Sequence, residues 1–200
     1  MIRISSAGIQ GLATFVARTP EVAAEAAKLA VGDAAEWGRN LSKREMVSAV
    51  NLPAGALAGR RFRISQRPTT ANPEAVISAD NNPLGLSRFV VGQKAKGSAH
   101  PKVRILVGGA TKSFSDPDTK GSYSFLIPTP NGADGVGLAI RTKGPLKNSS
   151  AARKIGRDLY LLSGPSVNQM FGQLMPTLVP RIEAKLQTEF ARQYERLIRG

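Results

Sequence analysis

The C-terminal stretch 165–200 constrains the fold of this chain most strongly, because its apolar residues recur at helical spacing. Steps of three, four or seven residues separate the members of this stripe: Phe171, Leu174, Leu178, Ile182, Leu186, Phe190 and Leu197. This period is that of an amphipathic helix with one apolar face. Because prolines interrupt the pattern at Pro176 and Pro180, we expect a short helix over 167–175 and a second helix from about Pro180.

An apolar stripe of this length must be covered by another surface. The sequence allows two alternatives for the covering surface, namely a sheet of the same domain or a second copy of the chain. The candidate packing or oligomer face consists of Phe171, Leu178, Ile182, Leu186, Phe190 and Leu197.

The N-terminal region predicts another long helix. Thr19, Pro20 and Glu21 combine a hydroxyl N-cap, a proline at the first position and an acid in the first turn. Apolar residues then continue at helical spacing, which predicts a helix from Pro20 to about Ala49. A shorter helical face precedes it, from about Ser6 to Arg18. We expect the two long helices to cover the same side of a sheet.

In the middle of the chain, the spacing of apolar residues changes from the helical period of 3.6 residues to a period of two. A period of two is typical of half-buried strands. The predicted strands are 61–65, 75–79, 88–92, 103–107, 124–127, 136–141 and 159–162. Turn-rich segments such as 128–135 separate them. The predicted fold class is therefore α+β: a central antiparallel sheet of short strands flanked by a long N-terminal helix and a C-terminal amphipathic helix. We predict one domain over 1–200, with a helical N-terminal arm over 1–50, a β-rich core over 60–163 and the C-terminal helix over 165–200.

The charge of the chain is strongly positive. It holds 28 Lys and Arg against 14 Asp and Glu, which gives a formal charge of +14 and a pI near 10.8. Such a field favours polyanions, and the candidate contact residues are Arg60, Arg61, Arg63, Arg67, Lys94, Lys96 and Lys102. Arg61 and Arg63 share one strand face if the alternation holds. Stacking aromatics are missing beside them, so any DNA contact is expected to be through phosphates and independent of sequence.

Two other interpretations of the basic residues stay open. They could dock onto an acidic neighbouring protein, because such a contact is also driven by charge. They could also form a basic, soluble surface without a specific partner.

Residues that carry catalysis or bind metals are scarce. There is no cysteine, and His100 is the single histidine, so a metal site of the His/Cys type is excluded. Asp116 and Asp118 flank a proline, which is more typical of a turn than of a calcium loop. Neither a nucleotide-binding nor a hydrolase motif occurs. We expect no enzymatic activity, no cofactor and no metal.

Membrane and export signals are also lacking in the sequence. No run of about eighteen apolar residues occurs, and the N-terminal residues do not read as a signal peptide. We expect no membrane span and synthesis in the cytoplasm.

The order of short segments along the chain resembles a known family. Leu52-Pro53 precedes the basic strand at 60–64, AlaValIleSerAla follows at 75–79, and SerGlyProSerValAsnGlnMetPhe at 163–171 leads into the basic terminal helix. Together these features resemble the minor tail protein Z family of long-tailed bacteriophages, also called tail-completion proteins. The resemblance extends from about Gly8 to Arg199.

This resemblance implies a non-catalytic structural protein of the virion. It would complete the head-proximal end of the tail and support head–tail joining and placement of the genome end. The implied partners are further copies in a ring, with a hexamer as the guess, and neighbouring tail-terminator, tail-tube or neck proteins. Genomic DNA would be touched only by non-specific phosphate contact. The protein would be made in the host cytoplasm and reside in the virion. The alternative function is a basic, sequence-independent nucleic-acid-binding protein.

Overall fold

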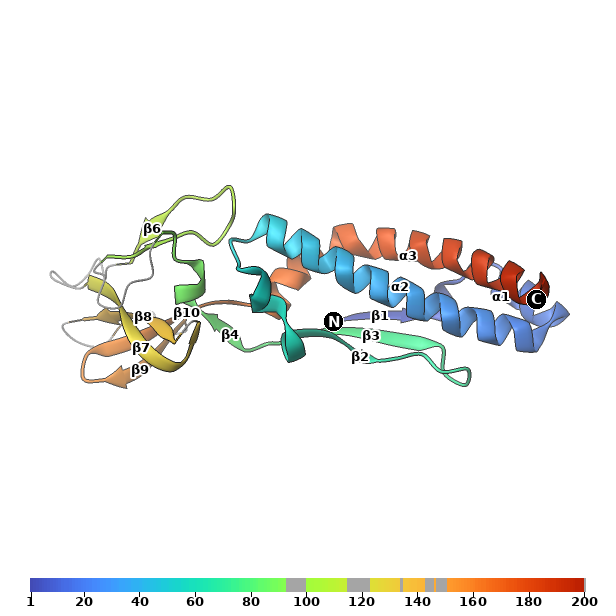
Figure 1. The fold of residues 1–200 in the computed structure, drawn as a ribbon, viewed down its shortest axis with the longest axis horizontal. Coiled ribbons are helices and arrows are strands. Elements are labelled where there is room, and N and C mark those ends of the chain that lie inside the picture. Colours follow the sequence, from blue (N-terminus) through green and yellow to red (C-terminus); the bar gives the residue numbers. More distant parts are fainter. Residues whose placement is uncertain (93–99, 115–122, 134, 143–145, 147–150, 200) are drawn as a thin grey trace. The chain divides into compact units, whose positions relative to one another are not determined.

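The computed structural model describes residues 1–92, 100–114, 123–133, 135–142, 146 and 151–199 (Figure 1). Contacts group the chain into two compact units. Unit 1 comprises Met1–Met46, Leu57–Asp80 and Val167–Gly200, and unit 2 comprises Val47–Ala56 and Asn81–Ser166. This grouping differs from the predicted ranges, because the strands near 62 and 74 belong with the helices rather than with the later strands. The single-domain assignment itself stays a prediction.

Unit 1 combines a small sheet with the long helices. Its elements are β1 (Ile2–Ser5), η1 (Ser6–Gly8), α1 (Leu12–Arg18), α2 (Pro20–Ala49), η3 (Gly59–Arg61), β2 (Phe62–Gln66), β3 (Glu74–Ala79) and α3 (Val167–Arg199), with the end of α2 and the short η2 (Ala54–Leu57) at the boundary of unit 2. The three strands form an antiparallel sheet in the order β1-β3-β2. The predicted helix from Pro20 to Ala49 is confirmed at both ends.

One face of the sheet of unit 1 is apolar and lies under both long helices (Figure 1). Ile2 lies opposite Ile77, which lies opposite Ile64, and Phe62 precedes Ile64 on the same face by strand alternation. The Phe62 ring meets the Phe171 ring of α3 edge to face, with centroids 4.9 Å apart. The prediction that the two helices cover one side of a sheet agrees with this arrangement.

Helices α2 and α3 approach each other closely because α2 presents small residues. Its buried positions include six alanines and Gly38. A Cβ atom at Gly38 would lie only 2.9 Å from Cδ1 of Ile182, so the side chain of Ile182 occupies the space that a larger residue would need. At the other end of the pair, Phe15 of α1 packs against Phe190 and Tyr194 with ring centroids 5.3 and 4.6 Å away.

The predicted break of the C-terminal helix near its prolines is wrong, because α3 is one continuous helix from Val167 to Arg199. Pro176 and Pro180 cannot donate to the carbonyls of Gly172 and Pro176. These three residues are exposed, so water can reach the released carbonyls. Each internal proline costs about 3 kcal/mol. Five side chains of the apolar stripe are buried, and burial contributes about 1.5–3 kcal/mol for each, which outweighs that cost.

Unit 2 is rich in strands. Its elements are β4 (Pro83–Gly85), η4 (Leu86–Phe89), β5 (Lys102–Val103), β6 (Lys112–Ser113), β7 (Tyr123–Ala133), β8 (Val136–Arg141), β9 (Ala152–Gly156) and β10 (Leu159–Ser166). The main sheet has the order β4-β10-β8-β7, with β9 also paired to β10, and β5 and β6 form a separate pair. One face of the main sheet packs against η4, where Phe89 fills the space above Gly164. The core on this face includes Leu126, Leu138, Tyr160 and Leu162.

The α+β class is confirmed, with antiparallel pairing throughout the described sheets. Within the residues that the structure describes, the strands are distributed over three sheets rather than gathered into a central one. The predicted strand 88–92 is wrong, because η4 occupies its start and only Val90 bridges to Val103. The predicted strand 103–107 is reduced to the end of β5 and a bridge from Leu106 to Val50. In the described part of the chain, no helix is apolar over enough length to cross a lipid bilayer.

Four of the described strands were not predicted from the sequence, namely β1, β4, β6 and β9. Strand β1 alternates Ile2 and Ile4 over only four residues and runs directly into a helical pattern. Strand β4 begins with a proline, and β9 is mostly exposed. Strands β1 and β4 depend on pairing with distant partners, β3 and β10, whereas β6 and β9 pair with strands close to them in the sequence, β5 and β10.

Candidate nucleic-acid interface

The predicted basic residues are divided between the two units. Arg60 and Arg61 lie in η3, Arg63 lies on β2, and Arg67 follows that strand, all in unit 1. Lys102 is an exposed residue of β5 in unit 2. Lys94 and Lys96 lie outside the described residues. The predicted set therefore does not form one site within either unit.

The predicted shared strand face of Arg61 and Arg63 is wrong, because the strand begins only at Phe62. Arg63 is exposed on the face of the sheet that points away from the helices, opposite Ser78. Hydroxyl groups cover part of this face, where the Oγ atoms of Ser65 and Ser78 are 2.6 Å apart. Arg67 is held in an ion pair with Glu36, at 3.2 Å. This region has a polar surface on which part of the positive charge is already neutralised.

The excess positive charge is concentrated in unit 2. Thirteen of the 28 Lys and Arg residues lie in unit 2, but only four of the 14 Asp and Glu residues do. Unit 2 therefore carries a formal charge of +9 and unit 1 carries +5. A polyanionic partner is attracted mainly to unit 2.

The face of the main sheet of unit 2 that points away from η4 presents aromatic side chains. Tyr123 and Phe125 alternate along β7, so their rings project from the same face, with centroids 5.5 Å apart. Tyr123 lies opposite Arg141, and Phe125 lies opposite Ala139. Tyr123 is 40% exposed, Phe125 is half-buried and Arg141 is exposed. A row of rings with a neighbouring cation is thus open to solvent.

The neighbouring strands extend this surface. Leu161 on β10 lies opposite Ala139 on one side and Arg153 of β9 on the other. A hollow of about 450 Å³ is lined on this face by residues that include Ile127, Gly137, Arg153 and Leu161. We call this surface the aromatic face and define it by Tyr123, Phe125, Ile127, Arg141, Arg153 and Leu161.

His100 lies at the edge of the aromatic face. Its backbone N–H donates to the carbonyl of Ser124 at 2.8 Å, and its ring centroid is 6.3 Å from that of Tyr123. Its φ of 52° places the backbone in the left-handed region, which is unfavourable for a residue with a side chain. Backbone strain of this kind is maintained only where the surroundings enforce it.

The aromatic face was missed at the level of sequence. Aromatic residues are sparse in the sequence, and stacking rings were considered only beside the arginines at 60–67. The cations of this face come from positions 141 and 153, and only strand pairing brings them onto the same face as Tyr123 and Phe125. The available signal was the alternation of Phe125 and Ile127 along the predicted strand 124–127, with Tyr123 directly before it.

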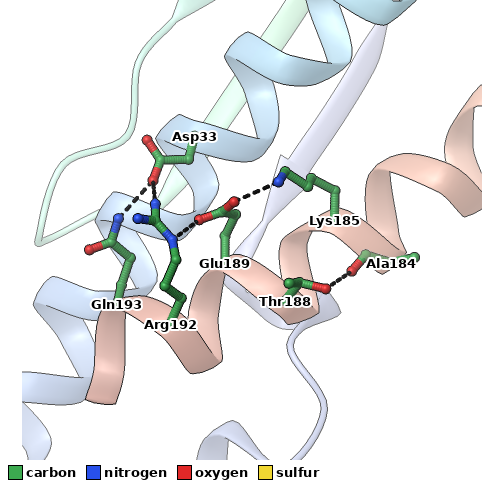
Figure 2. A network of polar contacts seen from close by, with 7 residues as sticks. All are labelled: Asp33, Ala184, Lys185, Thr188, Glu189, Arg192 and Gln193. Atoms are coloured by element: carbon green, nitrogen blue, oxygen red, sulfur yellow. Dashed lines mark hydrogen bonds and ion pairs between the residues drawn. The ribbon is translucent and has the colours of Figure 1, made fainter. Parts of the chain in front are cut away.

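A polar clamp joins α2 to α3 in unit 1 (Figure 2). Buried Glu189 receives hydrogen bonds from Lys185 at 2.7 Å and from Nε of Arg192 at 2.6 Å. Asp33 of α2 then accepts from Nη2 of Arg192 at 3.0 Å and from Nε2 of Gln193 at 2.7 Å. Each carboxylate is paired with a cation, so the clamp serves to hold the helices in register.

Glu189 acts in this clamp in its ionised form. Burial raises the pKa of Glu189, but the hydrogen bonds and charges of Lys185 and Arg192 together outweigh burial and hold the pKa below its ordinary value. The same carboxylate, together with Asp33, raises the pKa of the Arg192 guanidinium. The charged form of Glu189 therefore stabilises the folded state.

The predicted packing face on α3 is largely buried within unit 1. Its buried members are Phe171, Leu178, Ile182, Leu186 and Phe190. Leu197, the last member, is half-buried. Contacts within one chain thus cover most of this stripe, and its use in an oligomer stays a prediction.

Groups that could bind a metal ion do not gather in the part of the chain that is described: no three His, Asp or Glu side chains converge there. A scan of family models, a search of curated proteins and a search of solved structures each return no match. Fold and surface define an α+β protein with a helix-clamped unit and a strongly basic, sheet-rich unit.

Proposed function

We propose that this protein is a non-catalytic structural component of a long-tailed phage virion. It completes the head-proximal end of the tail and supports head–tail joining and placement of the genome end, as a ring of identical copies. The proposal rests on the resemblance to the minor tail protein Z family of the SerGlyProSerValAsnGlnMetPhe segment at 163–171 and of the basic helix after it. This segment forms the end of β10 and the start of α3.

Two properties of the chain support this role. The clamp and the buried face of α3 join α2 to α3 within unit 1, which suits a subunit of a permanent assembly. The charge of +9 on unit 2 suits a contact with DNA or with an acidic ring of a neighbouring tail-terminator, tail-tube or neck protein.

Co-purification tests the proposal. The tagged chain is expressed in infected cells during growth of the phage that encodes it, and the lysate is separated on a density gradient. We expect the chain to sediment with tails or whole virions, and tails made without it should fail to join heads. Recovery of the chain only at the top of the gradient, with normal head–tail joining in its absence, would contradict the proposal.

The second candidate function is sequence-independent nucleic-acid binding, which the concentration of positive charge in unit 2 favours. Phosphate contacts make the affinity depend on salt, with a slope of about −0.9 per contact for duplex DNA. Changing Arg61 and Arg63 together to Ser tests whether unit 1 takes part. If it does, affinity falls equally for unrelated duplexes, while stability changes by about 0.5 kcal/mol or less.

The matched control is Arg44→Ser, an exposed arginine on α2 outside the candidate set. If the double variant binds duplexes as the parent does, Arg61 and Arg63 do not contact DNA. A loss of binding to an acidic partner protein in the same variant would assign them to a protein contact instead.

A further inference from the structure

We infer that the aromatic face of unit 2 binds single-stranded nucleic acid, with bases stacked on Tyr123 and Phe125 and phosphates attracted by Arg141 and Arg153. This inference rests on the second candidate function and assigns it a location and a class of ligand. It also replaces the arginines at 60–67 with a different surface as the main contact.

The rings are placed as a stacking platform requires. Proteins that bind single strands without regard to sequence combine a basic groove with aromatic side chains, because every base offers a π-face. Tyr123 and Phe125 project from adjacent same-face positions of β7, with ring planes at 40° to each other. The 40% exposure of Tyr123 leaves its ring accessible.

The charge around the rings complements a phosphate backbone. Arg141 is the direct cross-strand neighbour of Tyr123, and Arg153 lies at the other side of the face on β9. Of the four acids of unit 2, only Asp158 lies within the described residues, and it occupies the turn between β9 and β10. Among the described residues, no acid belongs to the aromatic face, so the described charge of this face is positive and attracts an anion.

The shape of the face favours a single strand over a duplex. The hollow of about 450 Å³, which is lined by Ile127 two residues after Phe125 on β7, gives room for a splayed group between Ile127, Arg153 and Leu161. In a duplex the base faces are already stacked on one another, so the rings gain nothing from it. Duplex DNA can gain only phosphate contacts with the arginines of this face.

Fluorescence anisotropy of the full chain with labelled oligothymidine, and with a duplex of equal length, tests the inference. We expect Tyr123→Ala to weaken binding of the single strand by about tenfold at fixed salt, since one stacked base contributes a factor of this order. Binding of the duplex should change by no more than about twofold. Tyr123→Phe keeps the ring and should bind the single strand as the parent does.

The contribution of Arg141 is tested by the salt dependence of the affinity for the single strand. Arg141→Ser should make the salt slope for the single strand shallower by about 0.7, the value for one lost phosphate contact. Arg44→Ser, on α2 of unit 1, should leave the slope unchanged. Circular dichroism and thermal melting of each variant establish that the fold is retained.

The outcomes separate this inference from the functions on which it depends. If oligothymidine binds but Tyr123→Ala has no effect, the inference is overturned and the second candidate function stands. If neither oligonucleotide binds, both are overturned, while association with tails is untouched. If Tyr123→Ala changes the mass measured by light scattering instead of the affinity for oligothymidine, the face is a protein contact and the inference fails.

Discussion

The two sheets of this protein differ in what each face meets. The sheet of unit 1 has one face under α2 and α3, while its other face carries short hydroxyl groups and arginines such as Arg63. The main sheet of unit 2 has one face against η4, and its other face exposes the rings of Tyr123 and Phe125 beside cations. In the first case the uncovered face is suited to water, and in the second it offers stacking and charge to a partner.

The charges of the two units differ in the same way. In unit 1, cations are paired with acids on neighbouring elements: Arg181 with Glu45 at 2.8 Å and Arg192 with Asp33 at 3.0 Å both join α3 to α2. In unit 2, the four acids cannot neutralise thirteen cations. Charge in unit 1 therefore serves to align its helices, whereas charge in unit 2 is left to attract something outside the chain.

The most severe test of unit 1 is Ile182→Asp. Ile182 is 2% exposed and lies against Gly38, so an unpaired carboxylate at this position costs several kcal/mol. We expect unit 1 to lose its cooperative unfolding transition in urea. The matched control is Ile198→Asp on the same helix, where the side chain is 55% exposed and the change should be tolerated. A soluble Ile182→Asp variant with a normal transition would show that the α2–α3 packing is not essential.

Leu138→Ala probes the core of unit 2 and has a smaller expected effect. Leu138 is completely buried on the face that packs against η4, so its truncation should cost about 2–5 kcal/mol in the free energy of unfolding. Hydrogen exchange followed by mass spectrometry should show lost protection in β7, β8 and β10. Leu106→Ala, at a residue 53% exposed, serves as the control. If Leu138→Ala loosens the strands of unit 1 equally, the two units are not separate in stability.

The clamp of unit 1 should contribute to the acid dependence of stability. The pKa of Glu189 is held below its ordinary value of 4.5, so the charged carboxylate stabilises the fold above that pH. This contribution is lost as the pH falls through the folded-state pKa. Denaturation at a series of acidic pH values should give a shallower pH slope for Glu189→Gln than for the parent. An unchanged slope would show that Glu189 is not the group responsible.

Local sequence determined the helices and the most regular strands. The boundaries of α2 follow from Pro20 at its start and from helical spacing, which requires no knowledge of the partner surface. Strands β3 and β8 lie where the predictions 75–79 and 136–141 put them, because their apolar runs are long enough to carry a period of their own. The apolar stripe of α3 was likewise predicted as a face that must be covered.

Tertiary structure alone decided how these elements are used. Helix α3 continues through Pro176 and Pro180 because burial of its stripe outweighs a local penalty that sequence rules treat as decisive. Strand β1 pairs with β3, about seventy residues later in the sequence, and this pairing places both strands in unit 1. The aromatic face exists only because β7, β8, β10 and β9 bring Tyr123, Arg141, Leu161 and Arg153 together. Such long-range pairing depends on the summed burial of whole elements, whereas the sequence displays only the preferences of each segment.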